Sequence, residues 1–215
     1  MPVPEPPLSD ADASQVPPAA PAEDAAAATS ARTPSSTPVL AVLVAHDGGP
    51  WLAGTLTALA AQTHPHLEVV AVDNGSNDDT RAVLQAALGE DRVLVADRDL
   101  GFGAAVSMAL DARPVDTSPY VLLLHDDIAL EPDAVGELAG ALDDDPRLAI
   151  VGPKLLDWDD PRRLQSVGWT VDLTGRADSG VDEGELDQGQ RDVDRRTLYV
   201  STAGMLLRRE VFDRL

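Results

Sequence analysis

Acidic and imidazole side chains form four clusters in this chain, and each cluster follows a short apolar run. The clusters are His46-Asp47, Asp73-Asn74, Asp97-Arg98-Asp99 and His125-Asp126-Asp127. Carboxylate and imidazole groups are suitable ligands for Mg²⁺ or Mn²⁺, and carboxylates also accept hydrogen bonds from hydroxyl groups. A purely structural interpretation competes at each cluster, because Asp and Asn are common in turns after strands.

The cluster at 125–127 is the strongest candidate for chemistry. Four consecutive apolar residues, 121–124, lead directly into His125 and the adjacent carboxylates of Asp126 and Asp127. Neighbouring like charges raise each other's pKa and destabilise a fold unless a cation lies beside them. This pattern therefore favours a metal-binding or ligand-binding role over a simple turn.

The elements that must position these clusters are indicated by alternating hydrophobic patterns. Strands are expected at residues 39–45, 67–72, 92–96, 120–124 and 148–151, and helices at 51–62, 77–88, 101–111 and 134–142. Such alternation predicts an α/β fold with a mostly parallel central sheet flanked by helices. Ligands bind beyond the carboxyl ends of such strands, so the four clusters should meet at one rim of the sheet.

The two ends of the chain follow other patterns. Residues 1–37 are rich in Pro, Ala and Ser, which predicts a disordered tail before a domain at 38–215. After residue 153 the alternation stops. We expect a strand or hairpin arm at 164–173, a loop at 178–196, a last strand at 198–207 and the start of a helix at 208–215. The abrupt ending predicts that this domain is C-terminally incomplete.

Composition excludes several classes of function. The formal net charge of −21 disfavours nucleic acid as a partner, whereas a nucleotide could still bind through a metal ion. The chain has no cysteine, which excludes disulfides and thiolate chemistry. The longest apolar run, residues 39–45, is too short to span a membrane, and no signal peptide precedes it. As given, the chain is expected to be cytoplasmic.

Glycine and tryptophan residues supply weaker signals. Gly101 and Gly103 open a predicted helix, where backbone amides could receive a phosphate, but the G-x-G-x-x-G pattern of dinucleotide-binding proteins is incomplete. Trp51, Trp158 and Trp169 could stack on a base or a sugar ring. For Trp51, packing in the core is the first expectation.

Taken in order, these segments resemble the family 2 glycosyltransferases. The matching segments are 42–47 (VLVAHD), 72–78 (VDNGSND), 99–105 (DLGFGAA), 123–127 (LLHDD) and 201–209 (STAGMLLRR). The resemblance covers residues 39–215 and implies the GT-A fold. The chain departs from the family pattern at His46-Asp47, where Tyr-Asn is usual, at Asp99 in place of Asn, and at His125 in place of the first Asp of a D-x-D motif.

The resemblance implies a role for each matching residue. The nucleotide sugar would be bound by Ala45, His46, Asp73, Asp99, Gly101, Asp126 and Gly204. A divalent cation, Mg²⁺ or Mn²⁺, would be held by Asp127 and His125. The implied reaction is inverting, metal-assisted transfer of a sugar from a nucleotide-diphosphate sugar to a cell-envelope glycan or lipid-linked acceptor.

Four further segments are similar to one subgroup, the large actinobacterial enzymes whose GT-A domain precedes a multi-span membrane region. These segments are 125–127, 152–154, 157–161 and 184–189. The similarity implies that the intact protein lies at the cytoplasmic face of the membrane through a region outside this chain. The family 2 resemblance implies a catalytic base beyond Leu215, so a non-catalytic nucleotide-sugar-binding module or scaffold remains the alternative.

Overall fold

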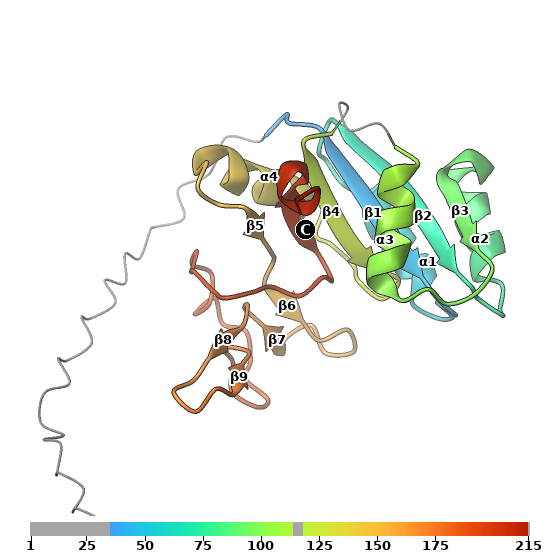
Figure 1. Cartoon of the computed structure of the whole chain (residues 1–215). Helices are drawn as coiled ribbons and strands as arrows, with labels where there is room; N and C mark the ends of the chain where they lie inside the picture. The colour runs from blue at the N-terminus through green and yellow to red at the C-terminus, as the bar shows by residue number, and fades with distance from the viewer. Residues whose placement is uncertain (1–34, 114–117, 215) are drawn as a thin grey trace, which may run out of the picture.

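The computed structural model describes residues 35–113 and 118–214 (Figure 1). Most of the predicted tail, residues 1–34, lies outside this range. Its last residues lie against helix α4 (Ala134–Asp144), where the hydroxyl groups of Ser35 and Thr37 donate hydrogen bonds to the carboxylate of Asp143. The chain is thereby attached to the domain just before the first strand.

A six-stranded sheet with the order β3-β2-β1-β4-β10-β5 forms the centre of the domain. Its strands are β1 (Val39–Ala45), β2 (Leu67–Asn74), β3 (Val93–Ala96), β4 (Tyr120–His125), β5 (Ile150–Val151) and β10 (Met205–Arg208). Strands β3, β2, β1 and β4 are parallel, and β10 is antiparallel to both of its neighbours. The mostly parallel sheet predicted from the sequence is confirmed.

The apolar strands are buried on both faces because helices cover both sides of the sheet. Helices α1 (Leu52–Ala60), α2 (Thr80–Leu88) and α4 pack on one face through side chains such as Leu52 and Leu84. Helix α3 (Phe102–Asp111) and the short α5 (Arg209–Phe212) cover the other (Figure 1). In the described part of the chain, no helix has the length and apolar character needed to cross a membrane.

Residues 152–204, which we call the projecting segment, extend beyond the ends to which the parallel strands point (Figure 1). They contain only two small hairpins, β6 (Leu155–Leu156) with β7 (Leu164–Ser166) and β8 (Thr170–Val171) with β9 (Ala177–Asp178). The strand expected at 164–173 is interrupted at Gly168, whose φ is +95°. The last strand is shorter than expected, because only residues 205–208 pair with the sheet.

Candidate functional site

The sheet register brings the four polar clusters to one rim. Ala45 at the end of β1 lies beside Asp73 on β2, while the preceding residue, Val44, lies beside His125 on β4. Asn74 at the end of β2 pairs with Ala96, the residue before the cluster at 97–99. Because these strands are parallel, their carboxyl ends form the edge at which such folds bind ligands.

Asp126 connects the ends of β1 and β4. Its Oδ2 accepts a hydrogen bond from the His46 amide at 2.9 Å, and its backbone carbonyl accepts one from Thr55 Oγ1 at 2.8 Å. Burial raises the pKa of Asp126, the His46 amide opposes this, and the charge of Asp127 adds to the increase. The Asp126 side chain therefore holds the turn after β1 as well as contributing charge to the rim.

A second network joins the ends of β2 and β3. Asp73 is only 3% exposed, and its Oδ1 accepts the amide of Ser76 at 3.1 Å. Asn74 donates from Nδ2 to Asp99 Oδ1 at 2.8 Å and accepts the amide of Leu100 at 3.0 Å. Asn74 belongs to a cluster named from the sequence but was not among the residues expected to bind the nucleotide sugar, since an Asn-Gly pair is interpreted first as a turn.

The turn before α3 is closed by its own acidic residue. Asp99 Oδ1 accepts the amide of Gly101 at 2.7 Å, which lowers the pKa of Asp99. Gly101 has a φ of +79°, and a Cβ placed there would meet nothing within 4 Å. The Gly101 amide is therefore engaged within the turn, while the space above it is open.

His125 joins the rim to the start of the last strand. Its Nε2 lies 2.8 Å from Thr202 Oγ1, and its ring centroid lies 4.5 Å from that of Phe102 at the start of α3. Gly204 follows, and its amide donates to the carbonyl of Leu123 at 2.9 Å. A Cβ at Gly204 would lie 2.9 Å from Pro153 Cγ, so this close approach requires glycine.

His46 lies at the rim in an acidic surrounding. Its Nδ1 is 2.9 Å from the carbonyl oxygen of Asn74, and this hydrogen bond raises the pKa of His46. The charges of Asp47, Asp99 and Asp126 raise it further, while desolvation opposes them. The ring is therefore held with Nδ1 protonated and donating to the end of β2.

Asp127 is exposed at the end of β4. Among residues 35–113 and 118–214, no group of three or more His, Asp or Glu side chains could enclose a metal ion. In the described residues the end of β4 therefore has an exposed carboxylate, Asp127, and no complete set of protein ligands for a metal ion.

The three tryptophans differ from one another. Trp51 is 45% exposed, so the expectation that it packs in the core is wrong; the next residue, Leu52, fills the core position at the start of α1. Trp158 is 43% exposed. Trp169 stacks on Tyr199 with 5.7 Å between ring centroids.

A hollow of about 520 Å³ lies at the other end of α3, between Ser107, Arg113, Arg209 and Phe212. There the buried guanidinium of Arg209 donates to the carbonyl of Leu110, in the last turn of α3, at 3.1 Å. The acidic rim lies near the first turn of α3, whereas this hollow lies near its last turn. The hollow is therefore remote from the rim. We therefore attach no role in the rim's chemistry to it.

Comparison with known proteins gives a family match and relatives. Residues 41–215 match the family described as Glycosyl transferase family 2. Two curated relatives from strains of Mycobacterium tuberculosis are each named N-acetylglucosaminyl-diphospho-decaprenol L-rhamnosyltransferase. Identity is 30% over 126 residues, covering 55% of this chain and 41% of the relative. The chain thus spans less than half the length of these relatives.

Solved structures share the fold. A mannosyltransferase from Pyrobaculum calidifontis, PcManGT in complex with GDP-Man and Mn²⁺, superposes with a TM-score of 0.57 at 19% identity, covering 86% of this chain and 48% of that one. The TarS 1-349 structure from S. aureus superposes with a TM-score of 0.50 at 19% identity, covering 64% and 42%. These likenesses show the GT-A fold. The family match extends over most of the chain, and the protein therefore belongs to glycosyl transferase family 2.

Proposed function

We propose that the acidic rim binds a nucleotide-diphosphate sugar together with Mg²⁺ or Mn²⁺. The sugar would pass to a cell-envelope glycan or a lipid-linked acceptor. One observation carries the proposal: the register of four parallel strands gathers Ala45, Asp73, Asn74 and His125 on a single edge, and Asp127 follows two residues after β4. In support, a structural neighbour is solved with GDP-Man and Mn²⁺, and the curated relatives are named for a diphospho-decaprenol acceptor.

Each cluster has a part in the proposed donor site. Asp73 and Asn74 form the floor of the base and ribose site at the end of β2, where their side chains accept the amides of Ser76 and Leu100. The ordered turn at Asp99 and Gly101 lies beside them. Ala45 and His46 line the end of β1, where Asp126 fixes the backbone. Gly204, which packs closely on Pro153, would lie beside the transferred sugar.

The rim fits a cation that is shared with the substrate. Mg²⁺ is usually bound through one or two carboxylates, with phosphates and water completing the shell. Exposed Asp127 suits that arrangement, with His125 as the second proposed ligand. In the structure His125 Nε2 is hydrogen-bonded to Thr202, so ligation through this atom would require that bond to break. When bound, the cation would stabilise the negative charge that develops on the leaving diphosphate.

The proposed transfer is a single inverting displacement. The acceptor oxygen forms a bond to the anomeric carbon, the bond from that carbon to the diphosphate oxygen breaks, and the acceptor proton passes to a carboxylate base. The family resemblance assigns this base to a segment after Leu215.

A thermal-shift panel tests the proposal directly. GDP-mannose, UDP-N-acetylglucosamine and an activated L-rhamnose are added with Mn²⁺, with Mg²⁺ or with a chelator. At a ligand concentration 100 times Kd, binding adds about 2.7 kcal/mol to the free energy of unfolding. We expect one donor to raise Tm in the presence of a divalent ion.

The matched variants are Asp127→Asn and Asp91→Asn, the second lying at the opposite end of the sheet before β3. Metal-dependent stabilisation should vanish in D127N and persist in D91N. Equal stabilisation of both variants would contradict the metal assignment. Donor binding without any transfer, both here and in a chain extended beyond residue 215, would instead favour the non-catalytic module.

A further inference from the structure

We propose that Trp51 and Trp158 together form a sugar-stacking surface that binds the acceptor glycan beside the donor rim. The inference rests on the proposed glycosyl transfer, because it assigns the second substrate of that reaction. It depends on where the two exposed indole rings lie, on what holds them there and on the charge of their surroundings.

Trp51 lies one helical turn from the acidic rim. It is the N-cap residue of α1, and its carbonyl accepts the amide of Thr55 at 3.1 Å. The hydroxyl of Thr55 also donates to the backbone carbonyl of Asp126 at 2.8 Å. The backbone of Trp51 is thereby tied, through Thr55, to the stretch of chain that carries Asp126 and Asp127, and its indole is 45% exposed.

Trp158 reaches the same helix from the projecting segment. A Cβ placed on Gly54 would lie 3.1 Å from Trp158 Cζ2 and 3.2 Å from Cη2, so the indole covers Gly54 directly. Residues three apart share one face of a helix, and Trp51 and Gly54 have that spacing. The two indoles therefore lie on the same side of α1, although 107 positions separate them in the sequence.

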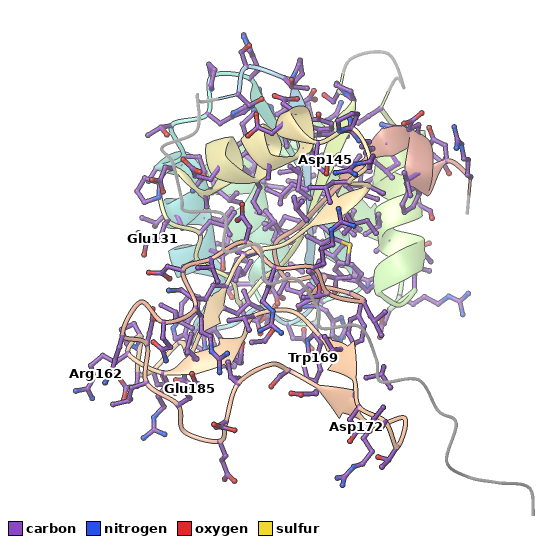
Figure 2. All side chains as sticks on the ribbon, turned by 90° about the vertical axis from the view of Figure 1, so that its left-hand side faces the viewer. Glu131, Asp145, Arg162, Trp169, Asp172 and Glu185 are labelled. Atoms are coloured by element: carbon purple, nitrogen blue, oxygen red, sulfur yellow. The ribbon has the colours of Figure 1, made fainter. Side chains whose placement is uncertain are left out.

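The loop that carries Trp158 is ordered by its own side chains. Asp157 Oδ1 accepts the amides of Asp159 at 2.9 Å and Asp160 at 3.0 Å, directly around Trp158. Asp160 in turn pairs with Arg162 at 2.8 Å, and Figure 2 shows Arg162 at the outer edge of the segment. Because the loop is already ordered, little conformational entropy should be lost when a ligand binds to the exposed Trp158 ring.

Two exposed indoles on a strongly acidic chain favour a neutral glycan as the occupant. The C–H face of a pyranose ring is apolar and fits against an indole, and its hydroxyl groups can donate to carboxylates. An exposed carboxylate, Asp159, follows Trp158 directly in the chain. A formal charge of −21 disfavours an anionic lipid surface or nucleic acid. Continuity with the donor rim through Thr55 and Asp126 separates this pair from exposed apolar side chains scattered elsewhere.

Tryptophan fluorescence tests the inference, since the chain has only three indoles. In a Trp169→Phe background, which keeps an aromatic ring beside Tyr199, the signal comes from Trp51 and Trp158 alone. The probes are methyl glycosides of N-acetylglucosamine, mannose and L-rhamnose, titrated with the donor nucleotide diphosphate and Mg²⁺ present. Saturation-transfer NMR on the same samples reports sugar contact directly. Nucleotide binding is measured separately by calorimetry.

We expect at least one glycoside to change the emission. Trp51→Ala and Trp158→Ala should each weaken its binding by about three- to tenfold. Trp51→Phe and Trp158→Phe should retain most of the affinity, and all four variants should bind nucleotide normally. If the parent chain did not bind nucleotide, the proposed function itself would be contradicted.

Three results would overturn the inference alone. One is normal nucleotide binding with no glycoside binding. Another is glycoside affinity that neither alanine variant changes. The third is binding to vesicles of phosphatidylglycerol that the alanine variants abolish, which would make the pair a membrane contact.

Discussion

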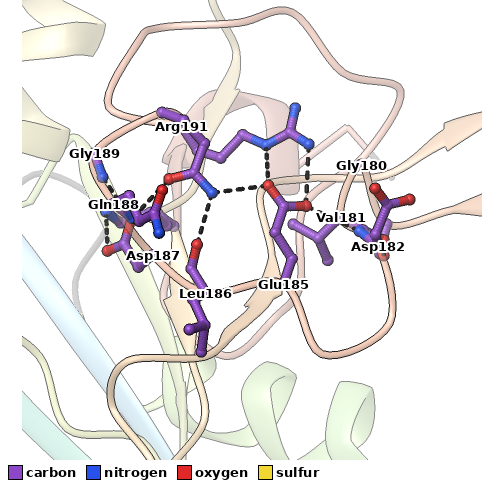
Figure 3. Close-up of polar contacts among 12 residues, drawn as sticks. Gly180, Val181, Asp182, Glu185, Leu186, Asp187, Gln188, Gly189 and Arg191 are labelled. Atoms are coloured by element: carbon purple, nitrogen blue, oxygen red, sulfur yellow. Dashed lines mark hydrogen bonds and ion pairs between the residues drawn. The ribbon is translucent and has the colours of Figure 1, made fainter.

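The two parts of this domain keep their shape by different means. From residue 39 to 151, long buried strands place the rim residues through sheet register, and the strands β1 and β4 have almost no exposed side chain. The projecting segment has short strands, and Leu173, Leu186 and Leu198 lie exposed on it. There, polar side chains do the positioning. Lys154 pairs with Asp187 and Asp192. Figure 3 shows the pairing of Arg191 with Glu185.

This difference matches the two substrates of the proposed reaction. A rim fixed by backbone register suits a nucleotide diphosphate, whose geometry is constant. A segment held by partly exposed ion pairs can change its loops without disturbing the core, because surface pairs contribute little to global stability. Figure 2 shows Trp169, Asp172 and Glu185 together at the end of the molecule away from Asp145, which follows α4.

The largest expected effect is on the free energy of unfolding, and it is seen by comparing one leucine from each part. Leu122 is fully buried in β4, whereas Leu173 is 108% exposed. Leu122→Ala should lower the free energy of unfolding by about 2–5 kcal/mol through lost burial and a cavity. Leu173→Ala should change it by less than about 0.5 kcal/mol. Chemical denaturation measures both, and similar losses in the two variants would remove the distinction between the parts.

A smaller effect is expected at the glycines of the rim. Gly75 has a φ of +79°, and a Cβ there would lie 2.4 Å from the carbonyl carbon of Arg98. Gly75→Ala should therefore cost about 1–3 kcal/mol and displace the turn beside Asp99. Denaturation and donor titration measure the two effects.

Two other glycines are matched controls for this variant. Gly101 has the same φ of +79° in open space, and Gly103 lies in α3 with nothing within 4 Å of an added Cβ. Gly101→Ala reports backbone strain alone, and Gly103→Ala should be neutral or slightly stabilising. Equal losses of stability and donor affinity in all three variants would contradict the idea that close packing of the turn against residues 98–99 shapes the donor rim.

The smallest effect concerns pH and the projecting segment. Hydrogen bonds from Arg191, first, and then from the amide of Asp182 and from Gln190 lower the pKa of Glu185 to about 2. A lowered acid pKa stabilises the fold above the unfolded value of about 4.3, and that contribution is lost as pH falls toward 2. Local order around residues 182–191 should decrease over this window while the core sheet persists.

Amide hydrogen exchange measured by NMR follows both regions through the titration. In Glu185→Gln, residues 182–191 should already exchange faster at pH 7, and their exchange should no longer change as the pH falls below about 4.5. Simultaneous loss of protection in β1 and in the loop would show that the two parts open as one unit.

The regular part of the fold was predictable from the sequence. The strand at Val39–Ala45 was expected with the observed bounds, and the helix at Phe102–Asp111 within one residue, because apolar runs and helical stripes record burial directly. The projecting segment was predictable only in outline: the hairpin arm beginning at residue 164 and the loop after 178 were expected, but the other short strands were not. Pairs such as Lys154 with Asp187 join residues far apart in sequence and leave no local pattern. The close approach of Thr197 to Gly168, where an added Cβ would lie 2.5 Å from Thr197 Cγ2, likewise joins residues far apart in sequence.

The site was predictable at the level of which strand ends carry acids. Which way each side chain turns was not. Asp126 accepts the amide of His46, His125 meets Thr202, and Asn74 bridges to Asp99, and none of these pairings leaves a periodic signal. The exposure of Trp51 was missed for a related reason: at a helix start, one residue of offset decides whether a ring faces the core or the solvent.

The hydrogen bonds of Ser35 and Thr37 to Asp143 have a practical consequence. They attach the chain to the domain at the amino end of β1, whereas the acidic rim lies at the carboxyl ends of the same strands. An affinity tag or surface linker joined ahead of residue 35 would therefore enter on the side facing away from both proposed substrates. Immobilisation through that end should leave donor and acceptor access open, which makes surface-based binding assays feasible on this chain.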